Sequence, residues 1–315
     1  MSWQPCCDVN VLKQRALLVS KIRAFFQKKQ ILEVETPLLS HSSNPDPHIE
    51  SCQTQVGKKN FYLQTSPEFH MKRLLASGSG SIYQICKAFR NHEIGNQHNP
   101  EFTLLEWYHL DYDYFALMAE VDEFLQQVAL APKALKTSYQ TLFEKYCKLN
   151  PHTASLASLK QSITQSAIKI DSPQLDRDDL LNLLMTHVIE PQLDDKIPII
   201  IYDYPASQAA LAKTKMTQGI TVAKRFEVYY QGVELANGFE ELTDATEQQQ
   251  RFELQNQQRK AKNLATLPID HYFLDALKAG LPDCSGVALG LDRLLMTVLD
   301  KPNLADILSF NYYNA

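Results

Sequence analysis

Three glutamates recur at intervals of seven residues in the last third of the chain, as Glu227, Glu234 and Glu241. Carboxylate oxygens are ligands that Mg²⁺ prefers, and a buried ammonium group needs them as partners. Because side chains alternate along a strand, this odd spacing would place successive glutamates on opposite faces of one straight strand. Turns at Gly232 and Gly238 would restore a common side. A shared acidic site is therefore a hypothesis that depends on those turns.

A second polar group lies in the first third of the chain. Glu106 and Tyr108 are two residues apart in a predicted strand, so they share a face. Glu68 follows Ser66 and Pro67 at the start of a predicted helix, with Ser66 as the expected N-cap. An acid in the first turn stabilises the helix dipole whether or not it binds a ligand. Spacing alone leaves both roles open for Glu68.

Two arginines stand at the ends of predicted elements. Arg90 ends a strand, and Arg293 lies in the first turn of a helix. A guanidinium binds carboxylates and phosphates through a planar fork, and helix N-terminal amides also favour anions. An isolated arginine more often forms a surface salt bridge, so a phosphate-binding role depends on the surrounding motifs.

Helices and strands predicted from the hydrophobic pattern position these residues. Apolar periodicity predicts a helix over 11–29, and a β-prone run follows over 31–35. The remaining pattern predicts strands at 61–64, 82–90, 102–110, 197–202, 226–230, 233–235 and 286–290, and helices at 67–76, after Asp244 and at 291–299. Hairpins with segregated helices indicate an α+β fold around a mostly antiparallel sheet. We expect one domain over 1–315, with a mostly helical insertion around 113–195 that carries no recognisable chemistry.

Composition narrows the class of protein. The chain has 315 residues, of which 44% are hydrophobic and 21% charged, so it can bury a sizeable core. It has neither an apolar run long enough to span a membrane nor a signal-peptide pattern, and we expect a cytoplasmic protein. Six cysteines without a C-x-x-C pair predict free thiols. The net charge of −5 argues mildly against a large nucleic-acid footprint.

Three segments resemble, in the right order, the signature motifs of class II aminoacyl-tRNA synthetases. Leu32–Leu39 resembles motif 1, which forms the dimer; Phe89–Glu93 with His98–Tyr108 resembles motif 2; and Gly286–Arg293 resembles motif 3. Together with the segment Glu234–Leu242, these motifs are similar to the lysyl-tRNA synthetase branch. The resemblance extends over essentially the whole chain from Val11.

This resemblance implies that ATP and Mg²⁺ are used to adenylate a lysine-like amino acid. Arg90 would bind the α-phosphate and the substrate carboxylate, Arg293 the terminal phosphate, and Glu227 and Glu234 the metal. The other positions that match nucleotide-binding residues are Asn91, His92, Asn99, Leu235 and Gly290. The positions that match the amino-acid pocket are Ser66, Pro67, Glu68, Glu106, Tyr108, Glu241 and Ala288.

Two positions depart from the lysyl-tRNA synthetase pattern. His92 stands where those enzymes usually carry glutamate, which puts a carboxylate contact to adenine in doubt unless the backbone makes that contact. Ala288 stands where they typically have glycine. A methyl group there would disfavour an α-amine while tolerating a β-amine, although alanine also simply packs better than glycine in a strand.

Only about 30 residues precede Glu33, which leaves no room for the anticodon-reading OB domain of lysyl-tRNA synthetases. The chain therefore resembles the family of short paralogues that ligate (R)-β-lysine to a lysine of elongation factor P. That resemblance implies elongation factor P as the acceptor, a homodimer, no stable tRNA binding and no membrane association. A truncated synthetase that charges tRNA or a tRNA mimic is the alternative. The retained arginines and glutamates disfavour a non-catalytic paralogue.

Overall fold

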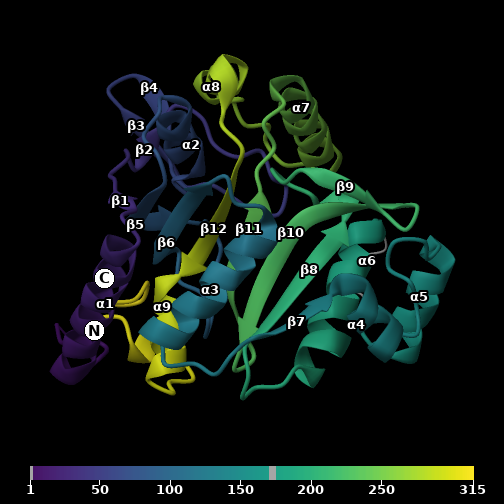
Figure 1. The fold of residues 1–315 in the computed structure, drawn as a ribbon, viewed down its shortest axis with the longest axis horizontal. Helices are drawn as coiled ribbons and strands as arrows, with labels where there is room; N and C mark the ends of the chain where they lie inside the picture. The colour runs from purple at the N-terminus through teal and green to yellow at the C-terminus, as the bar shows by residue number, and fades with distance from the viewer. Residues whose placement is uncertain (1–2, 170–174) are drawn as a thin grey trace.

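A large, mostly antiparallel sheet organises the molecule in the computed structural model, which describes residues 3–169 and 175–315 (Figure 1). Its central strands are all antiparallel, and the described pairings are parallel only at the two edges, between β1 and β5 and between β7 and β8. The strands, in spatial order, are β1 (Leu32–Glu33), β5 (Ile82–Phe89), β6 (Glu101–Leu110), β12 (Cys284–Gly290), β11 (Val233–Glu240), β10 (Ile220–Tyr230), β8 (Ile199–Pro205) and β7 (Leu135–Ser138), with β9 (Thr214–Thr217) paired to β10. The expected α+β fold is confirmed.

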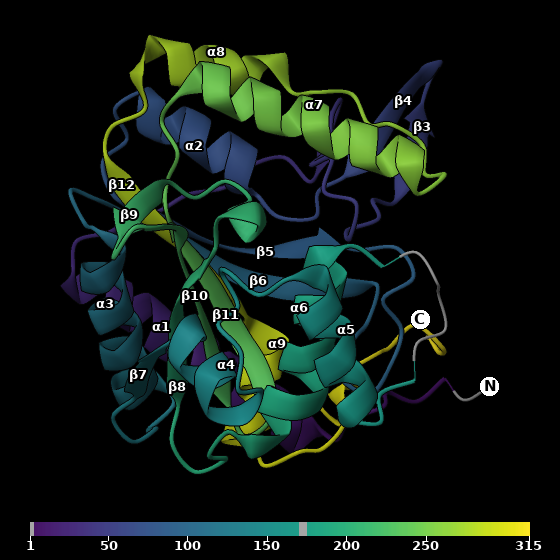
Figure 2. The same cartoon turned by 90° about the vertical axis from the view of Figure 1, so that its right-hand side faces the viewer.

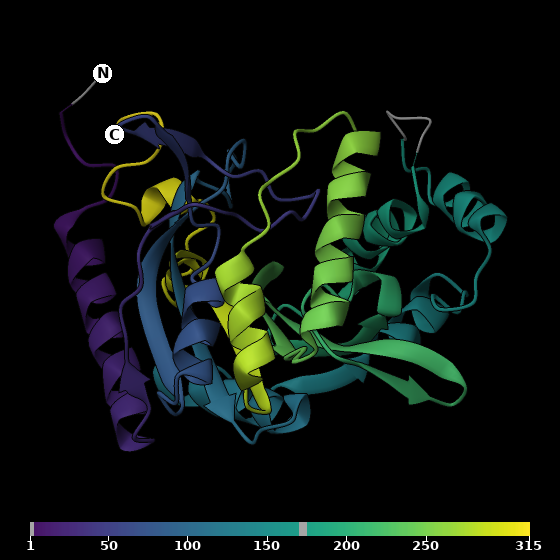
Figure 3. The same ribbon diagram turned by 90° about the horizontal axis from the view of Figure 1, so that it is seen from above.

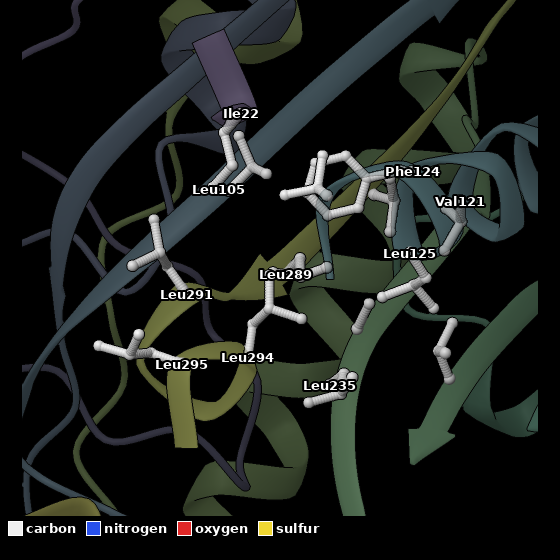
Figure 4. Close-up of a cluster of buried hydrophobic side chains, with 14 of the residues drawn as sticks. Ile22, Leu105, Val121, Phe124, Leu125, Leu235, Leu289, Leu291, Leu294 and Leu295 are labelled. Carbon is white, nitrogen blue, oxygen red and sulfur yellow. The ribbon is translucent and has the colours of Figure 1, made fainter. Parts of the chain in front are cut away.

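One face of this sheet carries the main hydrophobic core. Helices α1 (Val9–Lys28), α3 (Tyr114–Val128) and α9 (Leu291–Val298) cover that face. Leu105 and Leu289 point from β6 and β12 into the core that these helices close (Figure 4). Because strand side chains alternate, the neighbours Glu106 and Ala288 point to the opposite face. The polar residues singled out in the sequence therefore have a rigid, apolar layer behind them.

Two groups of helices flank the opposite face. Helices α2 (Glu68–Ala76), α7 (Ala245–Ala261) and α8 (His271–Gly280) stack at one end, and α4 (Tyr139–Tyr146), α5 (Leu156–Gln165) and α6 (Arg177–Leu184) pack at the other (Figures 2 and 3). Each group has its own apolar cluster: Phe252 and Phe273 are buried in the first, and Phe143 and Ile201 in the second. The two clusters hold the helices on either side of the middle strands.

Several elements were not predicted. β1 has two residues where five were β-prone, and β10 and β11 are longer than the predicted hairpin. Residues 61–63 of the strand predicted at 61–64 belong to β4 (Lys59–Leu63), which forms a small second sheet with β2 (Leu39–Ser40) and β3 (Gln53–Val56). Within the segment 113–195, α3 joins the main core, and β7 adds an edge strand to the large sheet. In the described part of the chain, no helix is both long and apolar enough to cross a membrane.

Candidate active site

A cleft of about 610 Å³ lies over the middle strands, between the two groups of helices. Two cross-strand rows from β6, β12, β11 and β10 form its floor. The first row is Glu106, Ala288, Asn237 and Glu227; the second is Tyr108, Gly286, Phe239 and Arg225. Residues directly opposite each other in a ladder share a face of the sheet. Register therefore delivers side chains from distant parts of the sequence to one surface.

The three glutamates spaced by seven do reach the same cleft. The hairpin turn at Gln231 and Gly232 reverses the chain between Glu227 and Glu234, as expected. Gly238, however, makes no turn: it lies in regular strand opposite Phe226. A β-bulge restores the common side instead, because Tyr229 pairs with Glu234 while Val228 pairs with Ala236, which leaves Leu235 as an extra residue. The three glutamates therefore lie on one side of the sheet, as predicted. The predicted turn at Gly238 was wrong, because the bulge at Leu235 takes its place.

One end of the cleft is acidic, and we call Glu68, Glu106 and Glu241 the acidic cluster. Ser66 Oγ donates to Glu106 Oε2 at 2.7 Å, and Tyr108 OH donates to Glu106 Oε1 at 2.7 Å. Glu68 is the first residue of α2 and also lines the cleft. Its position is therefore compatible with both roles considered for it, stabilising the helix dipole and binding a ligand. The preceding Pro67 occupies the N-cap position, where Ser66 was expected, and Ser66 Oγ accepts the Glu68 N–H instead.

Lys72, which was not singled out in the sequence, lies inside the acidic cluster. Its Nζ is 2.5 Å from Glu68 Oε1 and 2.5 Å from Glu241 Oε2, and the side chain is 1% exposed. Glu241 Oε2 accepts no aligned hydrogen bond, so its contact with Lys72 is an ion pair. The i,i+4 spacing of Glu68 and Lys72 on one helix was the only signal available, and such pairs usually lie on solvent-exposed faces.

Burial dominates the electrostatics of this end. It raises the pKa of Glu106 to about 7, with the charge of Glu68 as the next cause, while Tyr108 and Ser66 oppose the rise. Burial also raises the pKa of Glu241, which the ammonium of Lys72 counteracts. Desolvated carboxylates gain most from a cation that enters beside them. The acidic cluster is therefore suited to binding ammonium groups.

Arg90 and Glu234 line the other end of the cleft, and Arg293 contacts Glu234 from α9 without lining the cleft itself; we call these three residues the arginine end. Arg293 Nη1 donates to the Glu234 carbonyl at 2.8 Å and lies 3.7 Å from the Glu234 carboxylate, while Nη2 donates to His98 Nε2 at 2.7 Å. Arg90 lies over the Phe102 ring at 5.0 Å, and its Nε is buried without a hydrogen-bond partner. An unsatisfied buried guanidinium donor is costly unless a ligand accepts from it.

Glu227 is more heavily engaged than a free metal ligand would be. Its carboxylate accepts from Tyr204 OH at 2.6 Å, Tyr229 OH at 2.8 Å and Arg225 at 2.5 Å. Burial and the charge of Glu227 raise the pKa of Glu234, so the two carboxylates are electrostatically close. Within residues 3–169 and 175–315, no group of three or more His, Cys, Asp or Glu side chains is arranged to hold a metal by itself.

The remaining predicted nucleotide residues are dispersed. The exposed His92 adopts a left-handed conformation (φ 65°), and its ring contacts the Asn91 amide. Asn99 donates to the Glu101 carbonyl and accepts from the Tyr312 N–H. None of these three lines the cleft in the described part of the chain. Leu235 points into the hydrophobic core (Figure 4), which leaves only its backbone for a nucleotide. Gly290 is the N-cap of α9, beside Arg293.

The segment 113–195 also contributes to the cleft, which sequence reasoning missed. Tyr139, Asn182 and Glu190 line its wall opposite α7.

Arg225, Glu227 and Tyr229 alternate along β10 and therefore share a face of the sheet. This alternation in the sequence could have predicted that all three line the cleft.

Comparison with known proteins identifies the family to which this chain belongs. The family model for class II tRNA synthetases (D, K and N) matches residues 8–313. The chain belongs to this class II synthetase family. Within the family, it is 49% identical over 98% of its length to proteins from Salmonella arizonae, Salmonella gallinarum and Salmonella paratyphi B, with 97% of each of those chains covered. Each of the three is named elongation factor P–(R)-β-lysine ligase.

Both ends of the cleft lie inside the range that the family model matches. Arg90 follows β5, Arg293 lies in α9 and Glu234 in β11, and the acidic cluster comes from α2, β6 and the residue after β11. The matched residues, 8–313, include every residue named at the two ends of the cleft.

Proposed function

We propose that the protein activates (R)-β-lysine, or lysine, with ATP and transfers the aminoacyl group to a lysine side chain of elongation factor P. One observation carries this proposal: a single cleft holds a buried acidic cluster at one end and Arg90 with Glu234 at the other, where Arg293 contacts Glu234. An amino acid with ammonium groups would lie at the acidic cluster, with its carboxylate directed toward Arg90. The family membership and the names of the 49%-identical relatives support the same reaction.

Two steps account for the chemistry. The substrate carboxylate attacks the α-phosphorus of ATP and pyrophosphate leaves; the acceptor's ε-amine then attacks the acyl carbon and AMP leaves. The first step brings two anions together, so its catalysis consists mainly of positioning and charge neutralisation. The guanidinium of Arg90 has a buried Nε free to donate, and Arg293 is held in place by the Glu234 carbonyl. These are the groups we propose for the α-phosphate and the terminal phosphate.

The carboxylate of Glu234 fits a place in the shell of a magnesium ion, because it is partly exposed and its one described partner is Arg293. Mg²⁺ bound there would neutralise phosphate charge, but the described residues do not supply a complete set of ligands by themselves. We propose Glu234 as the principal ligand and Glu227 as the secondary one, since Glu227 must first give up a hydrogen-bond donor. Phosphate oxygens would supply the remaining ligands, so few would be needed from the protein.

The acceptor is proposed from the relatives, whose names specify elongation factor P. Because that factor serves translation, the reaction takes place in the cytoplasm. Motif 1 supports a homodimer, and the net charge of −5 argues mildly against stable tRNA binding.

The test has two stages. Pyrophosphate exchange should proceed with ATP, magnesium and either lysine isomer, without any nucleic acid, and an absolute requirement for tRNA would overturn the proposal. Intact-mass spectrometry of elongation factor P should then show one lysyl-sized addition, with acid-gel analysis of total tRNA run in parallel. Charged tRNA with unmodified factor would favour the truncated synthetase instead.

A further inference from the structure

Lys72 lies inside the acidic cluster, where substrate ammonium groups are expected to bind. It reaches the acidic cluster from α2, contacts Glu68 on its own helix and Glu241 beyond β11, and passes over the Phe273 ring at 5.8 Å. A lysine at 1% exposure carries a large desolvation cost, which only close carboxylates offset. Burial on its own would lower the pKa of Lys72, but the two glutamates raise it, so the side chain stays charged.

The charges of the acidic cluster and Lys72 match those of a substrate with two ammonium groups. The acidic cluster supplies three carboxylates, and Lys72 supplies one ammonium group, so the ionised cluster has a net charge of −2. Lysine and β-lysine each carry two ammonium groups at neutral pH. With the substrate carboxylate directed to the arginine end, such a substrate brings the acidic end to neutrality. An amino acid with a single ammonium group would leave a buried negative charge unpaired, which is costly.

We propose that Lys72 is a positioning residue that holds Glu68 and Glu241 apart at ammonium-binding distance and sets the charge of the fully ionised cluster so that it matches an amino acid with two ammonium groups. The proposal deepens the proposed function and rests on it. Lys72 need not touch the reacting atoms, because it acts through the two carboxylates that it contacts.

Loss of the charge at position 72 should change how the cluster titrates. The titratable groups facing this region are Glu68 from α2, Glu106 and Tyr108 from β6, Glu241 beyond β11 and Cys284 from β12. Without the ammonium group, the three carboxylates repel one another unopposed, and one of them holds its proton to higher pH. Substrate binding requires the ionised cluster, so its dependence on pH should move in the same direction.

The experiment compares wild type with Lys72→Gln and Lys72→Arg in pyrophosphate exchange between pH 6 and 9. Lys72→Gln should raise the KM for the amino acid by about tenfold or more at pH 7 and shift the acid limb of kcat/KM to higher pH. The KM for ATP should stay within about twofold of wild type, because the arginine end is unchanged. Lys72→Arg keeps the charge, so its acid limb should stay at the wild-type pH even though the larger head group raises the KM.

Lys224→Gln is the matched control, since Lys224 forms a comparable ion pair with Glu240 at 2.5 Å and does not line the cleft. An unshifted acid limb in Lys72→Gln, with both KM values raised alike, would reduce Lys72 to a packing residue. If Lys72→Gln does not fold, the arginine variant decides: an acid limb displaced from wild type overturns the proposal. Should the wild type show no exchange at all, the proposed function is wrong, and calorimetric titration of the same proteins with lysine still measures the effect of Lys72.

Discussion

Ala288 lies directly opposite Glu106 in the register of β12 and β6, and its other neighbour in the row is Asn237 on β11. Its methyl group therefore rises from the floor of the cleft beside a carboxylate of the acidic cluster. Removing the methyl with Ala288→Gly should raise activity on α-lysine relative to β-lysine, by about tenfold to a few hundredfold. Pyrophosphate-exchange kinetics with both isomers would measure the ratio.

Ala236→Gly provides the control for backbone loosening, because Ala236 is an alanine of the neighbouring strand that faces the main core. It should lower stability and leave the isomer preference alone. An unchanged preference in Ala288→Gly would identify Ala288 as a residue that only packs the strand.

Arg90→Ala and Arg293→Ala should each reduce pyrophosphate exchange by about a hundredfold or more, because each removes a guanidinium proposed to donate to developing phosphate charge. Circular dichroism should show the fold intact, since both side chains are partly exposed at the arginine end. Arg23→Ala is the control: Arg23 pairs with Glu33 on the surface, and exposed pairs contribute little. Near-normal exchange in either cleft variant would mean that the phosphates lie elsewhere.

Gly286→Ala should abolish amino-acid binding. A Cβ at this position would lie 2.3 Å from Tyr108 Cε1 and 2.6 Å from Glu241 Oε1, so the tyrosine or the carboxylate must move. Gly95→Ala is matched, since a Cβ there meets nothing within 4 Å. Calorimetric titration with lysine should detect binding to the Gly95 variant alone, and equal affinities would show that the cleft relaxes around the added methyl.

Amino-acid binding should strengthen as pH rises from 6 to 8. Glu106 has a pKa of about 7, so it is mostly protonated at pH 6, and its carboxylate form is the one that binds an ammonium group. The KM for the amino acid should therefore fall by up to about tenfold over this range, with little change in the KM for ATP. A flat profile would show that Glu106 is ionised throughout or does not contact the substrate.

Glu106→Gln should lose amino-acid activation and gain stability at high pH. The pKa of this carboxyl is raised in the folded protein, so the wild type has no ionisation penalty below about pH 4.5 and the full penalty above about pH 7. The amide removes that penalty, which amounts to about 3 kcal/mol at pH 8, and should give little benefit at pH 5. Denaturant titrations at the two pH values would measure the difference. Equal effects at both would contradict the titration argument.

Much of the fold followed from local pattern. Alternation in β6 and β12 predicts which residues face the core and which face the cleft, and Glu106 and Tyr108 behave as expected. The caps at Asp113 and Asp244 also form as their residue types favour. These features depend on neighbours in sequence, which a single chain displays directly.

The unpredicted features depend on pairing across the sheet. β7 is a four-residue edge strand with only Leu135 strongly apolar, and its parallel partner β8 is about sixty residues away. The contact of Lys72 with Glu241 likewise joins two segments that no periodicity relates. Glu227 was a predicted site residue, and Arg225 and Tyr229 share its face of β10, but its other tyrosine partner, Tyr204, comes from β8 and is brought alongside only by register.

The extra residue at Leu235 divides β11 into two halves that are out of phase with each other. Before it, Glu234 serves the arginine end; after it, Asn237 and Phe239 belong to the floor rows that lead to the acidic cluster. Deleting one residue here would straighten the strand and rotate one half by a full pleat, turning Glu234 into the core or the floor residues away from the cleft. A single inserted residue therefore keeps the proposed nucleotide end and the proposed amino-acid end on the same side of the sheet, so the segment between Glu234 and Glu241 should tolerate substitution far better than a change in length.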